Sequence, residues 1–138
     1  MEKMLSTLMS EEHRKLFEIL DKFEHNLKDI GLFNTFKWNL KKHFALEERA
    51  IFDIYNKIRG EEVAAIFDLM KEHGEILNLI KDVEDSVNNE TIKSIEELKS
   101  VLDRHHKFED KEFYPKLDED LNPEQKQEIR EKIEAFIE

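Results

Sequence analysis

The chain has 138 residues, and 22 lysines and arginines stand against 33 aspartates and glutamates, so its formal net charge is −11. This balance argues against nucleic-acid binding, because neutralising phosphates requires clustered basic residues. The absence of cysteine excludes disulfides, zinc ribbons, thiol nucleophiles and iron–sulfur clusters. The longest apolar run, residues 63–67, is far shorter than the roughly 18–20 residues that span a bilayer. With no signal peptide at its start, we expect a cytoplasmic protein that contacts no membrane.

Few residues interrupt helical structure, because the chain contains only 3 glycines and 2 prolines while 40% of its residues are charged. The predicted breaks are Gly31, Arg59-Gly60, Asn88-Asn89, Pro115 and Asn122-Pro123. They divide the chain into a short tail and four long segments, whose apolar residues recur at spacings of three and four. Short connections between four such helices favour an antiparallel up-down-up-down bundle. We therefore predict one all-α domain over residues 1–138, with the bundle at about 10–115. Its first helix is expected to follow a cap at Ser10 and its fourth to stop at Pro115.

A short extra helix is predicted at the C-terminus, over residues 123–137. Asn122 suits the N-cap, Pro123 the first helical position and Gln125 the position that completes a capping box. One side of this helix is apolar, so we expect it to cover an end or a side of the bundle. A homodimer surface is the alternative for that side.

Four histidines are predicted to lie at one level of the bundle. Residues at the same height on two antiparallel helices have numbers that average to the turn between them. The mean is 28 for His13 and His43, 58 for His43 and His73, and 89 for His73 and His105. Each mean lies within about three residues of a predicted turn, or roughly 5 Å of height. Each helix therefore contributes one histidine, on its apolar side.

Two glutamates share the faces of these histidines, because Glu47 follows His43 by four residues and Glu109 follows His105 by four. An ionised carboxylate in an apolar core costs several kcal/mol unless it is paired or bound to a metal, and these faces carry no Lys or Arg. Imidazole with carboxylate suits iron, manganese or zinc, and two carboxylates between imidazole clusters suit a bridged pair of ions. A polar core network is the alternative for this set.

Neighbouring residues receive supporting or structural interpretations. His106 lies about 100° around the helix from His105, so we expect it at the surface or beside the ligands, with a role as an additional ligand held in reserve. Glu48 and Glu72 are expected to face solvent or to accept from ring N–H groups. Trp38 is expected in the core, and His25 is expected to be exposed. Aromatic residues one turn from the ligands, Phe44 and Phe108, are candidates for the dry wall of a ligand pocket.

The two helices that carry these pairs form an internal repeat, since residues 40–52 align without gaps on residues 102–114. Ferritin-like sites instead use Glu-x-x-His, which none of the histidines fits. The chain resembles the hemerythrin-like HHE domain family over residues 10–115. The resemblance is carried by Glu-His13, His43-Phe-Ala-Leu-Glu47-Glu48, Glu72-His73, His105-His-Lys-Phe-Glu109-Asp110 and Phe113-Tyr114-Pro115.

This resemblance implies a four-helix bundle that holds two non-haem iron ions, bridged by two carboxylates and an oxo or hydroxo group. The expected ligands are His13, His43, Glu47, His73, His105 and Glu109. Asp110 is the reserve for Glu109, because oxygen carriers of the family use a spacing of five residues while the wider family and the internal repeat use four. The carriers also have a further histidine where this chain has Leu77, so one iron would lack an imidazole.

The partners that the resemblance implies are the small ligands O2, NO and peroxide. Our first hypothesis is a protein that binds or senses O2 or NO, rather than a dedicated enzyme. The second is a di-iron redox protein that reduces peroxide or NO, or that stores and donates iron for repair. The third is a structural bundle with zinc or without a metal, which would have no visible colour.

Overall fold

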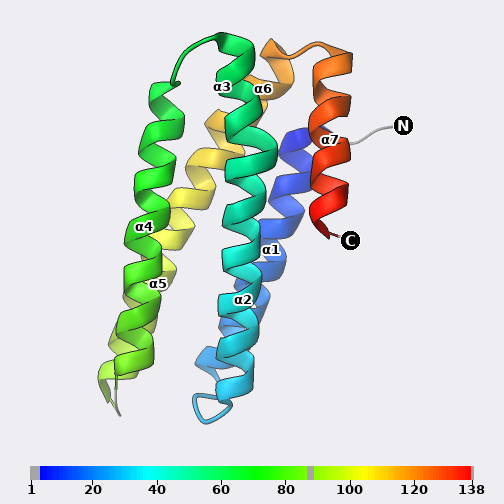
Figure 1. Cartoon of the computed structure of the whole chain (residues 1–138). Coiled ribbons are helices and arrows are strands. Elements are labelled where there is room, and N and C mark those ends of the chain that lie inside the picture. The colour runs from blue at the N-terminus through cyan, green and yellow to red at the C-terminus, as the bar shows by residue number, and fades with distance from the viewer. Residues whose placement is uncertain (1–3, 87–88, 138) are drawn as a thin grey trace.

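The computed structural model describes residues 4–86 and 89–137, and every regular element within them is helical (Figure 1). The elements are α1 (Leu5–Glu24), α2 (Ile30–Leu46), η1 (Glu47–Phe52), α3 (Asp53–Arg59), α4 (Ala64–Asp85), α5 (Asn89–Phe108), η2 (Glu109–Phe113), α6 (Tyr114–Asp120) and α7 (Pro123–Ile137). The elements α2, η1 and α3 form one continuous rod, and α5, η2 and α6 form another. The predicted all-α four-helix bundle with an extra C-terminal helix is confirmed.

The four rods run antiparallel, with α1 packed against α2, α4 against α5, and α6 returning to α1 (Figure 1). The turns fall close to the predicted positions: α1 ends at Glu24 and α2 begins at Ile30, while α4 follows α3 after residues 60–63. Asn89 begins α5, and Asn88, the other half of the predicted break, lies outside the described residues. No helix in the described part of the chain has both the length and the apolarity to cross a membrane.

Local sequence explains three of the helix ends. Asp29 caps α2 by accepting from the N–H of Leu32 at 3.2 Å. Gly60 ends α3 at φ 69°, a left-handed conformation in which glycine avoids the steric cost of a Cβ. The predicted capping box before α7 is present, since Asn122 Oδ1 accepts from the N–H of Gln125 at 2.8 Å and the Gln125 side chain accepts from the N–H of Asn122 at 3.0 Å.

The predicted start of the first helix is wrong, because α1 begins at Leu5 and Ser10 lies inside it. The cap comes from the distant residue Asp118, whose carboxylate accepts from the N–H of Leu5 at 2.9 Å and from the N–H of Ser6 at 3.0 Å. The Ser6 hydroxyl donates to the same carboxylate at 2.8 Å. A cap supplied by tertiary structure leaves no mark in the local pattern around the helix start.

The predicted stop at Pro115 is also wrong, because the fourth rod continues through α6 to Asp120. A π-helical turn, η2, immediately precedes this proline. In η2 the backbone hydrogen bonds span five residues, as from the N–H of Tyr114 to the carbonyl of Glu109. The N–H that proline lacks therefore falls where the hydrogen-bond register changes, so the helix passes Pro115 at little cost.

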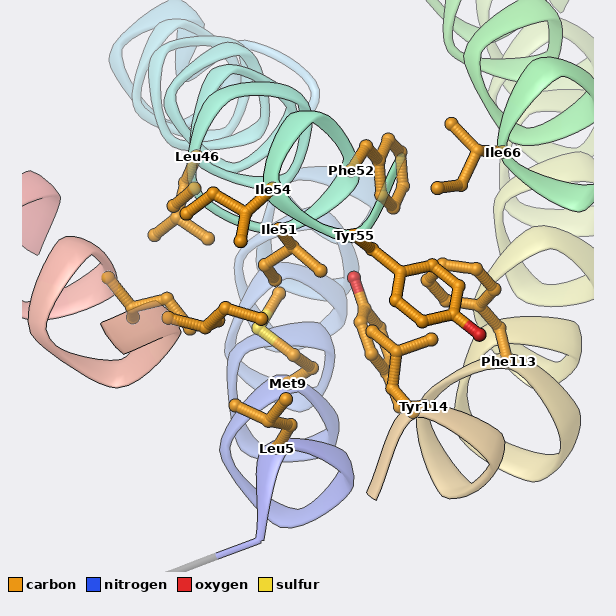
Figure 2. Close-up of a cluster of buried hydrophobic side chains, with 14 of the residues drawn as sticks. Leu5, Met9, Leu46, Ile51, Phe52, Ile54, Tyr55, Ile66, Phe113 and Tyr114 are labelled. Atoms are coloured by element: carbon orange, nitrogen blue, oxygen red, sulfur yellow. The ribbon is translucent and has the colours of Figure 1, made fainter. Parts of the chain in front are cut away.

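Two apolar clusters fill the bundle, one on each side of a polar layer. One cluster includes residues of α1, η1, α3 and α6, and Figure 2 shows Tyr114 in it beside Met9, and Phe113 beside Tyr55. Ile129 and Ile133 of α7 are buried in this cluster, so the apolar side of α7 covers one side of the bundle, as the lid interpretation predicted. Trp38 contradicts its prediction, because 70% of it is exposed on the outer face of α2.

Candidate metal centre

A layer of buried polar side chains crosses the bundle between the two apolar clusters. All six predicted ligands belong to it, and each is at most 4% exposed. A seventh member joins them from α5, so the layer consists of His13, His43, Glu47, His73, His105, His106 and Glu109. Every rod contributes to the layer, which confirms that the four predicted histidines lie at one level.

The two glutamates lie between histidines of different rods. Glu47 Oε1 is 3.3 Å from Nε2 of His43 and 3.2 Å from Nε2 of His73. Glu109 Oε1 has the equivalent position, 3.3 Å from Nε2 of His13 and 3.4 Å from Nε2 of His105. Each carboxylate thus faces one imidazole of its own rod and one of a neighbouring rod, and the four Nε2 atoms converge on the two Oε1 atoms.

These atoms form two groups that can each hold a cation, because within each group the ligand atoms lie within 4.8 Å of one another. One group consists of His13, His43, His106 and Glu109, and the other of Glu47, His73, His105 and Glu109. Glu109 is common to both groups. A carboxylate shared in this way is suited to bridging two ions.

Several buried atoms of the layer have no hydrogen-bond partner among the described residues: Nε2 of His13, His73 and His105, both ring nitrogens of His43 and His106, and Oε1 of Glu47 and Glu109. Each buried polar atom without a partner costs about 1–3 kcal/mol. Several such atoms that point into one space are explained together if cations bind there, since a cation accepts lone pairs from imidazole and carboxylate alike. The donor set therefore fits metal ions.

Three further carboxylates hold the outer nitrogens of the imidazoles. Asp110 lies 2.9 Å from Nδ1 of His13, Glu48 3.2 Å from Nδ1 of His73, and Glu72 2.6 Å from Nδ1 of His105. A carboxylate on Nδ1 places the ring proton there and leaves the lone pair of Nε2 directed at the centre. This confirms the supporting roles predicted for Glu48 and Glu72. Asp110 has the same position, so it does not take the place of Glu109, which points inward.

Tyr114 joins the two central carboxylates from the side of the first apolar cluster. Its hydroxyl donates to Glu47 Oε2 and lies 3.4 Å from Glu109 Oε2, and its ring is fully buried. The π turn makes this possible, because a ladder that spans five residues brings Tyr114 over Glu109. Sequence reasoning missed this role, although the repeat aligns Tyr114 with Phe52 and so marks where one half gains a hydroxyl.

Of the two positions expected for His106, the surface is wrong and the place beside the other histidines is confirmed, since only 3% of this residue is exposed. Its ring stacks on that of His13 with centroids 3.7 Å apart and planes 4° from parallel. The signal was present in the sequence: His106 follows Leu102 by four residues and precedes Glu109 by three, so it shares their helix face. A buried stripe wider than one residue accommodates both His105 and His106.

The two central carboxyls differ in how readily they ionise, because the pKa of one is raised and the pKa of the other is lowered. Burial, then the negative charge of Glu47, raise the pKa of Glu109 well above its usual range. Burial also disfavours ionisation of Glu47, but His43 and hydrogen bonds from Glu109, His43 and His73 outweigh it and hold its pKa well below its usual range. Cations at the centre would favour both carboxylates in the ionised form.

The halves of the bundle are related by a pseudo-twofold arrangement that extends the repeat seen in the sequence. Phe44 stacks on His73 with centroids 3.8 Å apart, and His106, its counterpart in the repeat, stacks on His13. Phe44 is 3% exposed and walls the centre as predicted. Phe108 does not, because 38% of it is exposed.

Comparison with known proteins identifies one family. The model of the hemerythrin HHE cation binding domain matches residues 4–117 of the chain, and it also matches residues 64–137. The first match spans α1 to α5, η2 and most of α6. The second begins at α4, where the second half of the pseudo-twofold arrangement starts. No curated protein and no solved structure matches the chain.

Proposed function

The chain belongs to the hemerythrin HHE cation-binding family, and from this premise we propose that its buried centre binds two iron ions and takes up O2 or NO reversibly. The observation that carries the proposal is the pair of ligand groups that share Glu109. The enclosure of the centre supports a small ligand, because no residue of the polar layer is more than 4% exposed.

The ligands proposed for one ion are His13, His43, His106 and Glu109, and those for the other are Glu47, His73, His105 and Glu109. The first group has three imidazoles and the second has two. His106 adds an imidazole to the first group, whereas Leu77, one turn after His73, adds none to the second.

Iron held by these residues would supply a redox-active cation that can bind O2 or NO. The protein residues hold the ligands in place and exclude water. Asp110, Glu48 and Glu72 fix three imidazoles through Nδ1, which keeps each Nε2 directed at the centre. Phe44 closes the wall behind His73, and the Tyr114 hydroxyl holds a proton beside both central carboxylates.

The first experiment is metal content per chain, with visible spectra of the reduced protein before and after exposure to O2 and again after O2 is removed. Two irons per chain and a spectrum that returns on removal of O2 are expected. The double variant Glu47→Ala, Glu109→Ala should not bind two ions, whereas the control pair Glu18→Ala, Glu75→Ala on exposed positions should. Zinc in place of iron, or two ions retained by the first double variant, would refute the proposal.

A redox role is the second candidate, and the position of Tyr114 favours it, because a phenol beside the carboxylates is a local proton source. In that case exposure to air would oxidise the reduced centre permanently, and peroxide or NO would be consumed over repeated cycles of reduction. The same spectra therefore distinguish the two candidates.

A further inference from the structure

Two imidazoles of the centre, His43 and His106, have no carboxylate on an outer ring nitrogen among the described residues. The repeat pairs His106 with Phe44, which has no ring nitrogen, but it pairs His43 with His105, whose outer nitrogen meets Glu72. In His13, His73 and His105 the outer nitrogen meets a carboxylate of the chain. In His43 the outer nitrogen, Nδ1, is buried and has no hydrogen-bond partner among the described residues. Because His43 is only 4% exposed, bulk solvent does not readily provide a hydrogen-bond acceptor for this nitrogen. A buried N–H without an acceptor is costly, and an acceptor is to be sought nearby.

The pseudo-twofold arrangement indicates which residue this acceptor is. Each position in α1 corresponds to the position in α4 that lies 60 residues later, so His13 corresponds to His73. Each position in α2 corresponds to the position in α5 that lies 62 residues later, so His43 corresponds to His105. The pair Glu72 and His105 in one half therefore corresponds to Glu12 and His43 in the other.

The correspondence holds for the printed contacts between carboxylates and imidazoles of the centre. The bond from Glu48 to His73 has its counterpart in the bond from Asp110 to His13. The contacts of Glu47 Oε1 with two Nε2 atoms are repeated by Glu109 Oε1 at distances that differ by at most 0.1 Å, 3.3 and 3.2 Å against 3.4 and 3.3 Å. Only the fourth supporting pair is not formed.

Glu12 and His43 line one pocket, which lies between α1 and α2 and has a volume of about 280 Å³. Glu12 is half-buried at its rim. Because Nε2 of His43 faces Glu47 at 3.3 Å, Nδ1 lies on the opposite edge of the ring, away from the centre. Lys15 and Lys42 also line the pocket, so its charge favours a carboxylate inside.

We propose that Glu12 is the fourth supporting carboxylate, and that its side chain turns into this pocket to accept a hydrogen bond from His43 Nδ1 when the centre binds cations. The inference rests on the proposed metal centre. A cation on Nε2 withdraws electron density from the ring and makes the N–H at Nδ1 a stronger donor, which favours a charged acceptor. Glu12 is thus a positioning residue that acts through His43.

Asn39 is the competing acceptor, because it lines the same pocket one helical turn before His43. Its side chain already donates to the carbonyl of Thr35 at 2.7 Å. The repeat places Val101 at the equivalent position of α5, so an amide here has no counterpart in the other half. Both observations favour Glu12.

The test compares zinc affinity, measured by competition with a chromophoric chelator, in the wild type and in Glu12→Ala, Glu72→Ala, Asn39→Ala and Glu18→Ala. Loss of a supporting carboxylate typically weakens metal binding by about 10–100-fold. We expect a loss of this size for Glu12→Ala and Glu72→Ala, and no change for Glu18→Ala, an exposed glutamate of α1, or for Asn39→Ala.

Rescue separates support of His43 from general damage. Formate or acetate fits the pocket that Glu12→Ala leaves open, so either should restore zinc affinity in that variant and not in Glu18→Ala. With a chelator present, the melting temperature of Glu12→Ala should equal that of the wild type, because His43 Nδ1 has no bond among the described residues that this substitution could remove.

The outcomes are distinguishable from failure of the proposed function. If the wild type does not bind two ions, the metal centre itself is refuted. If the wild type binds two ions and Glu72→Ala weakens them while Glu12→Ala does not, or if Asn39→Ala has the effect instead, the role of Glu12 alone is refuted. A loss in Glu12→Ala that no carboxylate rescues also overturns it.

Discussion

Replacing Tyr114 by phenylalanine removes one hydroxyl from the centre and leaves the ring in place. The ring is fully buried, so water does not replace the bond to Glu47 Oε2. A hydrogen bond to a charged group contributes about 1.5–3 kcal/mol, and the 3.4 Å contact with Glu109 adds little. We expect metal-free Tyr114→Phe to lose about 2–3 kcal/mol of unfolding free energy, which is about 8–12 °C in melting temperature for a chain of this length.

Tyr55→Phe is the matched control, because it also removes a hydroxyl that donates to a carboxylate. The Tyr55 hydroxyl lies 3.0 Å from Asp120 Oδ2, and Asp120 is exposed, so water takes the place of the lost partner. The expected loss is about 0.5–1 kcal/mol. The measurement is urea unfolding of both variants at pH 7 with a chelator present.

The same unfolding curves with zinc bound provide a second comparison. Cations neutralise the central carboxylates, so Glu47 depends less on the phenol and the loss in Tyr114→Phe should shrink. A metal-free loss no larger than that of Tyr55→Phe would show that the hydroxyl is not a necessary partner of Glu47. The assignment of Tyr114 to the centre would then be refuted.

Three further predictions concern stability. Removal of metal with a chelator should lower the melting temperature by about 10 °C relative to protein in a free metal concentration of about 100 times the dissociation constant of the metal. Binding at that concentration adds about 2.7 kcal/mol to the free energy of unfolding. Equal melting curves would contradict the ligand assignment. Burial lowers the pKa of His106, with the neighbouring His13 and His43 adding to the effect. As the pH falls, His106 therefore takes up a proton more readily in the unfolded chain than in the folded protein. The metal-free protein should lose stability as the pH falls below about 6.5. His106→Phe should reduce that loss in urea titrations between pH 5 and 7.5, and an unchanged slope would contradict it. Gly74 is exposed inside α4 and a Cβ there meets nothing within 4 Å, so Gly74→Ala should stabilise the protein by about 0.5–1 kcal/mol in the same assay.

The bundle and the level of its histidines could be predicted because both follow from local rules. Apolar spacing identifies the helices, and the mean of two residue numbers identifies the turn between two helices of an antiparallel pair. The spacing of four residues placed Glu47 and Glu109 with their histidines in advance. These inferences need only the helical period and short connections.

The features that escaped prediction depend on contacts between distant segments. Asp118 caps α1 from more than one hundred residues away in sequence, so the start at Leu5 has no local signal. The π turn η2 shifts the register of α6, which carries the helix through Pro115 and brings Tyr114 over Glu109. Trp38 is exposed although tryptophan is a large apolar residue, because the helical period places it on the outer face of α2.

The two halves of the bundle differ at positions that matter to the centre. The repeat pairs Phe44 with His106 and Phe52 with Tyr114, and in both pairs the second member carries the polar atoms. Both polar members come from the rod that contains α5 and α6, and the ring of His106 stacks on His13. The first of these differences gives three imidazoles to one ligand group and two to the other, because His106 belongs to the group of His13 and His43. Two ions held by these groups would therefore differ in their number of imidazoles, and His106→Phe, which places there the residue found at position 44 of the other half, should leave two imidazoles in each group.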